Sequence, residues 1–149
     1  SHWQVLDANA STAALFSLVG LPADAARDLN LLTTLLQPGG LGDYLINPEE
    51  IRTLAWQRAT REALSNPVLA SLMQTLSAPD SLAALPRELP PLVLTRIACV
   101  HGELNFMSTF TTFGMPLDIT VTSMRIEHLI PADAQTWQIM TAAYERSRG

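Results

Sequence analysis

The chain has 149 residues, of which 48% are hydrophobic and 15% are charged, and its formal net charge is -5. This composition excludes a disordered tail, because disorder needs low hydrophobicity and high charge, and the length favours one domain with a sizeable core. All 9 basic residues are arginines and they form no cluster, so the chain by itself is a poor candidate for binding nucleic acid.

The single cysteine, Cys99, allows neither an internal disulfide nor a cysteine-based zinc site, which fits a cytoplasmic protein. No apolar run approaches the roughly 18 residues of a membrane span, and the first residues lack a signal-peptide pattern. The chain opens with Ser1 and His2, which resemble the remnant of a tag, and has no initiator Met. We therefore interpret residues 3–149 as one domain excised from a longer protein.

The first half of the chain predicts mostly helices. Asn9 is placed to cap the first of them, and Asn47 to cap the longest, which begins at Pro48. Glu49 and Glu50 fall in its first turn, where the helix dipole favours negative charge, so we assign them a structural role. In chain order, we expect a strand over residues 3–9, helices over 10–16 and 29–36, a breaker at 37–40, helices from Pro48 to Asn66 and from Pro67 onward, and a short helix over 77–85.

The second half changes character and predicts three strands and a closing helix. Residues 92–100 are β-branched and apolar, and a tight turn at His101 and Gly102 leads into a strand over 103–113. A loop over 114–118 and a strand over 119–130 complete an antiparallel meander. A helix over 131–148 follows, with Trp137, Met140 and Tyr144 on one face.

This order predicts an α+β fold, with one antiparallel sheet and helices packed on one of its faces. The first strand is separated from the later three by a helical middle. That arrangement is PAS-like, and in it the sheet and the middle helices enclose an apolar pocket.

Several segments of the sequence resemble one known family. Residues 106–120, followed by 125–133, resemble the end of the MmyB-like ligand-binding domain, and the run from Thr111 through Gly114 to Glu127 is the most specific part. Residues 3–9, and 38–44 leading into 56–62, resemble it as well. The likeness covers most of the chain.

The resemblance implies a PAS-like domain that follows an XRE-type helix-turn-helix in bacterial one-component regulators, with small apolar ligands that include fatty acyl chains. The helix-turn-helix is absent from this sequence. DNA would then be contacted only through that missing domain.

Little in the sequence indicates an enzyme or a cofactor. Cys99 and His101 would share a strand face by alternation, but nothing nearby would activate the thiol, so an inert cysteine is favoured. No histidine or cysteine spacing is typical of a metal site, and the glycines of 39–42 lack the context of a phosphate loop. We expect no catalytic residues, no metal and no cofactor.

The arginines leave two interpretations open. Arg58, Arg96 or Arg125 could clamp the polar head of a ligand through a bidentate hydrogen-bond pair. Alternatively, Arg125 pairs with Glu127 on its own strand, and Arg58 with Glu62 one turn away. This structural alternative is favoured.

The apolar candidates are equally open, because a core and a pocket wall use the same residue types. The expected pocket residues are Phe16, Leu32, Leu36, Trp56, Arg58, Leu69, Met73, Arg96, Phe106, Phe110, Met124 and Arg125. The leading hypothesis is a cytoplasmic sensor that binds a small, mostly apolar molecule and biases DNA binding by the linked helix-turn-helix, as a homodimer. The alternative is a ligand-free dimerisation module that uses the stripe on the last helix.

Overall fold

The computed structural model describes residues 3–79, 92–112 and 124–148 of the chain. The described part is an α+β domain with one three-stranded antiparallel sheet, in the order β1–β2–β3. The strands are β1 (Thr95–Cys99), β2 (Gly102–Thr112) and β3 (Arg125–Pro131). The predicted meander is therefore confirmed, although β1 and β3 begin later than expected. Residues 119–123 of the expected third strand lie outside the described residues.

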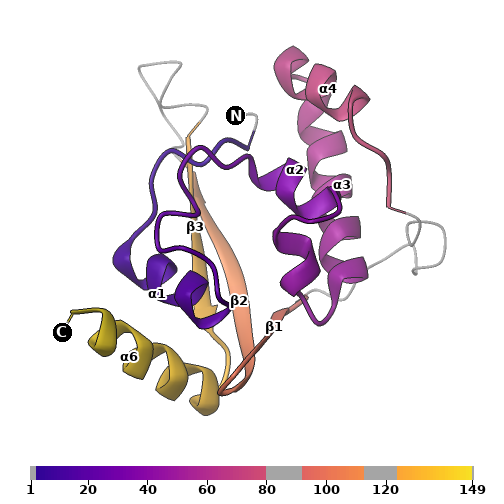
Figure 1. The fold of residues 1–149 in the computed structure, drawn as a ribbon. Coiled ribbons are helices and arrows are strands. Elements are labelled where there is room, and N and C mark those ends of the chain that lie inside the picture. Colours follow the sequence, from indigo (N-terminus) through magenta and orange to yellow (C-terminus); the bar gives the residue numbers. More distant parts are fainter. Residues whose placement is uncertain (1–2, 80–91, 113–123, 149) are drawn as a thin grey trace.

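Two groups of helices pack against this sheet (Figure 1). The first group is α1 (Ala10–Leu18) and α6 (Ala134–Arg148). The second group is α2 (Leu31–Leu36), α3 (Pro48–Ala63) and α4 (Pro67–Gln74), joined by the short 3-10 helix η1 (Leu41–Tyr44). The helix expected over 77–85 falls mostly on residues outside the described part, and residues 77–79 have no regular structure.

Each helix group has its own hydrophobic core. Leu104 and Phe106 of β2 are buried against α1 and α6, whose Ala14, Leu15 and Ala143 complete this first core. The second core lies among the other helices and contains Trp3, Leu32, Ala55, Ala59 and Leu69.

Both groups use the same face of the sheet. The pairing of β1 with β2 and of β2 with β3 has no bulge, so side chains alternate strictly along β2. Phe110 therefore lies on the same face as Leu104 and Phe106, and it contacts Arg58 of α3. The prediction that the helices share one face of the sheet is thus confirmed.

The predicted strand over residues 3–9 is wrong. This segment makes only an isolated bridge, between Gln4 and Asn30, and it does not join the sheet. Trp3 has a positive φ of 70°, a conformation that an extended strand does not use. The segment after η1 lies along the outer edge of β1 instead. There Leu45 bridges to Ile97, and the Ile46 amide donates to the Arg96 carbonyl.

The asparagine caps are confirmed in part. Asn9 accepts a hydrogen bond from the Thr12 amide at 2.9 Å, as predicted, and Asn66, at the predicted boundary between two helices, accepts one from the Leu69 amide at 3.2 Å. Asn47 precedes α3 as predicted, but its side chain makes no capping bond. It bonds to β1 instead, so its role as a side-chain cap is a wrong prediction.

Candidate functional site

Aromatic and charged side chains gather on the helical face of the sheet, around Phe110. The guanidinium carbon of Arg58 lies 4.4 Å from the centre of the Phe110 ring, and that of Arg125 lies 5.5 Å from the same centre. Arg125 also lies 5.5 Å from the Trp3 ring. We call Trp3, Arg58, Glu62, Phe110 and Arg125 the arginine–aromatic cluster. It joins the N-terminal segment, α3, β2 and β3.

Arg125 is neutralised by a carboxylate from another element. Its two terminal nitrogens donate to the two oxygens of Glu62, with the Nη2–Oε2 contact at 3.2 Å. Only about a quarter of each side chain is exposed, at 22% and 26%, so water screens this pair less than it would at the surface. The expected pairing of Arg125 with Glu127 is replaced by this longer-range pair, in which 63 residues separate the partners.

The electrostatic environment of Arg58 differs from that of Arg125. Its burial, and after that the nearby positive charge of Arg125, lower the pKa of Arg58 below its ordinary value. Glu127 and Glu62 act in the opposite direction through space. Within the described residues Arg58 makes no ion pair or hydrogen bond, and its direct contact is with the Phe110 ring.

Glu127 borders the cluster on β3, directly opposite Phe110 in the strand pairing. It is exposed, and its carboxylate accepts a 2.6 Å hydrogen bond from the Ser108 hydroxyl. The face of the sheet around Phe110 therefore carries two arginines and two carboxylates, and only one arginine and one carboxylate form a direct pair.

A cleft opens at the other end of the helical side, between the C-terminal ends of α1 and α6 and the turn from β1 to β2. Its volume is about 780 Å³, which falls within the usual range for small-molecule pockets. Its wall includes Ala14, Leu18, Cys99, His101, Ala143 and Arg146. None of the twelve residues predicted from the sequence lines this cleft.

The structure distributes the predicted site residues over several places. Arg58, Phe110 and Arg125 come together in the arginine–aromatic cluster. Leu32, Leu36, Leu69 and Met73 belong to the core among α2, α3 and α4, and Phe106 belongs to the core beside α1 and α6. Phe16 is buried in α1, Trp56 is half-buried on α3, and Met124 is exposed by 36% before β3.

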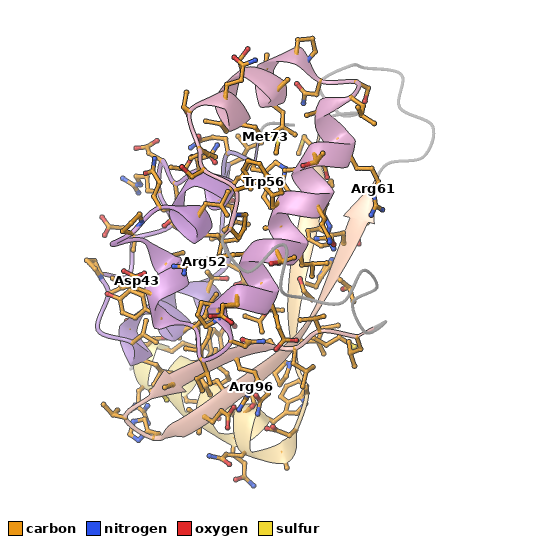
Figure 2. All side chains as sticks on the ribbon, turned by 90° about the vertical axis from the view of Figure 1, so that its right-hand side faces the viewer. Asp43, Arg52, Trp56, Arg61, Met73 and Arg96 are labelled. Carbon is orange, nitrogen blue, oxygen red and sulfur yellow. The ribbon has the colours of Figure 1, made fainter. Side chains whose placement is uncertain are left out.

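Arg96 stands apart from the other candidates. It alternates with Ile97 and so points to the opposite face of the sheet, where its guanidinium pairs with Glu103 at 2.5 Å. Figure 2 shows Arg96 at the sheet, well away from Trp56 and Met73 in the helical part.

Sequence reasoning missed Trp3 and gave Glu62 the wrong partner. Trp3 was expected in a strand of the sheet, whereas it is buried in the second core and donates to Glu62. The spacing of Arg58 and Glu62 on one helix indicated a local pair. No sequence signal points to Arg125 as the partner of Glu62, because this contact depends on how α3 lies over the start of β3.

Comparison with known families identifies the chain. The family described as "MmyB-like transcription regulator ligand binding domain" matches residues 1–143. The chain belongs to this family. Neither the curated proteins nor the solved structures that were compared gave a match to this MmyB-like domain.

Two further observations bear on the chemistry of this MmyB-like domain. Among residues 3–79, 92–112 and 124–148, no three His, Cys, Asp or Glu side chains are grouped so that they could hold a metal ion. No helix in the same ranges is both long and apolar enough to cross a bilayer.

Proposed function

We propose that this domain is the cytoplasmic sensor of a bacterial one-component transcription regulator of the XRE type. It binds a small, mostly apolar molecule, for which a fatty acyl chain is the leading candidate class. The observation that carries the proposal is the family match over residues 1–143, since the family is defined as a ligand-binding domain of transcription regulators. The low charge content, 15% of the residues, supports an apolar ligand.

The ligand occupies the helical side of the sheet in this proposal. Five apolar members of the predicted set lie on that side in two separate cores, namely Leu32, Leu36, Leu69, Met73 and Phe106, and Phe110 lies on the same face of the sheet, against Arg58 of α3. A ligand that entered between the groups would contact both. The cleft near Cys99, of about 780 Å³, is another candidate place on the same side.

The mechanism is a shift between two states. A ligand changes DNA binding by the linked helix-turn-helix only if it binds one arrangement of the domain, or one dimer geometry, more tightly than the other. Two helix groups with separate cores are suited to this, because one group can move relative to the other without opening either core.

The proposal is tested by a search for the ligand. The domain is purified, extracted with organic solvent and examined by mass spectrometry, and alkyl carboxylates, alcohols and esters are then titrated against thermal stability. A ligand at 100 times its Kd adds about 2.7 kcal/mol, which raises the Tm of a domain of this size by about 5–10 °C. Absence of any extracted molecule, together with no shift over the whole panel, would overturn the proposal.

A ligand-free dimerisation module is the second candidate, and one observation favours it. Trp137 on α6 is 58% exposed, although Met140 from the same predicted stripe packs against the first core. Sedimentation velocity of the wild-type domain and of Trp137→Ser tests this candidate. A wild-type dimer that dissociates in the variant supports it, whereas a wild-type monomer at high concentration contradicts it.

A further inference from the structure

The outer edges of β1 and β3 differ in what lies against them. The edge of β1 is contacted by Leu45, Ile46 and Asn47, which bridge or bond to it. Along β3, no described residue makes a backbone hydrogen bond to the outer side of the strand. The strand is seven residues long, mostly exposed, and free of bulges in its pairing with β2. Within the described part of the chain, β3 is thus an open edge, which is a template for another strand.

The hydrogen bonds of the sheet show which way the backbone groups point. Opposite residues of an antiparallel pair alternate between exchanging two backbone bonds and exchanging none. The Arg96 amide and carbonyl bond on the outer side of β1, so Arg96 and Asn105 exchange none. The Asn105 amide and carbonyl bond in the other direction, to Thr136 and Ala132. By alternation, residues 107, 109 and 111 of β2 point their backbone groups toward β3.

The register of β2 with β3 extends this pattern to the outer edge. The even-numbered residues of β3 lie opposite residues 107, 109 and 111, so their backbone groups bond inside the sheet. The amides and carbonyls that point outward belong to Arg125, Glu127 and Leu129. Pro131 ends the edge, because proline has no amide to donate.

The side chains along this edge are complementary to those of a second copy. Arg125 and Glu127 carry opposite charges and lie two residues apart, on the same face of β3. When two copies pair in antiparallel fashion about Ile126, Arg125 of each copy lies opposite Glu127 of the other. Ile126, which is 47% exposed, then lies opposite its own counterpart on the other face of the sheet. Opposite charges and apolar side chains are both stabilising as cross-strand pairs.

We propose that two copies of this domain associate edge to edge through β3, with Ile126 on the two-fold axis, so that their sheets join into one. Backbone hydrogen bonds supply the attraction in such strand addition, and the side-chain pairs select the register. Glu127 is suited to its part, because it is exposed and its carboxylate is held by a serine hydroxyl of its own sheet. The inference concerns a protein partner and does not rest on the proposed ligand.

Cysteine cross-linking tests the register. Ile126→Cys is made in a Cys99→Ser background, which removes the other thiol of the chain, and is oxidised in air before non-reducing electrophoresis. At the axis the two Cα atoms lie about 4.5 Å apart, a distance that a disulfide spans. His128→Cys in the same background is the matched control. It lies on the same face, but its counterpart is four residues further along, roughly 13 Å away. We expect a cross-linked dimer of Ile126→Cys and none of His128→Cys.

Sedimentation velocity tests the edge itself, in the wild type, Glu127→Ala and Glu127→Pro. Both substitutions remove the charge, and proline also removes an outward amide without affecting a bond to β2. We expect Glu127→Ala to weaken association about tenfold, since two symmetric charge pairs are lost, and Glu127→Pro about tenfold further. Glu145→Ala, at an exposed position on α6, should have no effect. Circular dichroism checks that each variant folds.

The outcomes separate this interface from the alternatives. A wild-type domain that stays monomeric up to about 1 mM would overturn the inference, and this result needs no variant. Cross-linking of His128→Cys in place of Ile126→Cys would overturn the register about Ile126. A dimer that persists in Glu127→Pro and is lost in Trp137→Ser would assign the interface to α6. None of these results bears on ligand binding, which the titrations against thermal stability measure separately.

Discussion

The indole nitrogen of Trp3 donates a 2.9 Å hydrogen bond to Oε2 of Glu62, the same carboxylate that Arg125 binds through two nitrogens. One carboxylate on α3 therefore holds both the N-terminal segment and the start of β3. The segment is held further by two backbone bonds of 2.8 Å, from the Val5 amide to the Leu29 carbonyl and from the Leu31 amide to the Trp3 carbonyl. These contacts maintain Trp3 at a positive φ, which a non-glycine residue adopts only when its surroundings stabilise it.

Glu62→Gln should loosen this junction. The substitution leaves Arg125 partly buried without its carboxylate and weakens the acceptor for Trp3, so we expect a loss of about 1–3 kcal/mol in the free energy of unfolding. Hydrogen exchange should become faster at the amides of Val5 and Leu31 than elsewhere.

The control for this prediction is Glu49→Gln, which makes the same charge change at an exposed position on the same helix. It should change stability by less than about 0.5 kcal/mol. Unchanged protection of Val5 and Leu31 in Glu62→Gln would show that the carboxylate does not hold the N-terminal segment.

Asn47→Ala should loosen the contact between the start of α3 and the edge of β1. The Asn47 side chain donates to the Leu94 carbonyl at 2.7 Å and accepts from the Arg96 amide at 3.1 Å, so it bonds to β1 where a further strand would otherwise pair. Its loss leaves two partly buried backbone groups unpaired, and we expect a destabilisation of about 1–3 kcal/mol with faster exchange at the Arg96 amide.

Asn66→Ala is the matched comparison for Asn47→Ala. Asn66 also precedes a proline at a helix start, but it caps its own helix, at the Leu69 amide. Its removal should destabilise the domain by about 1 kcal/mol and leave exchange at Arg96 unchanged. If the two variants behave alike, the Asn47 bonds to β1 do not contribute to the sheet.

The two Asn-Pro pairs also show how far the sequence predicts this fold. Local signals fixed both helix starts correctly, because a proline in the first turn and a preceding asparagine act over a few residues. They could not reveal that Asn47 accepts a hydrogen bond from Arg96 of β1, 49 residues away. The meander was predictable for the same local reason, since its strands are apolar, consecutive and joined by a short turn.

The misplaced N-terminal segment has the opposite explanation. Residues 3–9 have the composition of a strand, but a strand needs an edge with which to pair. At the outer edge of β1, Leu45 and Ile46 already make these contacts. For the site, the sequence named Arg58, Phe110 and Arg125 as separate candidates. Only the register of β2 with β3 and the position of α3 bring them into one cluster.

The two cores should respond independently to mutation. Leu104 is fully buried beside α1 and α6, and Leu69 is fully buried among α2, α3 and α4, in clusters that share no buried residue. Each Leu→Ala substitution should reduce the free energy of unfolding by about 2–5 kcal/mol. The double variant should equal the sum of the single variants within about 0.5 kcal/mol in urea denaturation. A larger coupling would mean that the helix groups behave as one core.

Acid stability should depend on Asp133, which caps α6. One of its carboxylate oxygens accepts from the Thr136 amide and the other from the Asn105 side chain, both at 2.8 Å. Hydrogen bonds from Thr136, followed by the one from Asn105, lower the pKa of Asp133 in the folded protein. The stabilisation is therefore complete above the ordinary aspartate pKa of about 3.9 and is lost as the pH falls through the lower folded value.

Asp133→Asn should consequently flatten the acid limb of the stability profile. Asparagine keeps a capping oxygen but has no charge to titrate, so urea midpoints between pH 5 and pH 2.5 should fall less steeply than in the wild type. Asp24→Asn, an exposed substitution in the turn after α1, should leave the slope unchanged. Because Thr136 is fully buried and its hydroxyl also bonds the Asn105 amide, protonation of Asp133 should loosen the joint between α6 and β2 first. A slope in Asp133→Asn that matches the wild type would place the acid-sensitive carboxylate elsewhere in the fold.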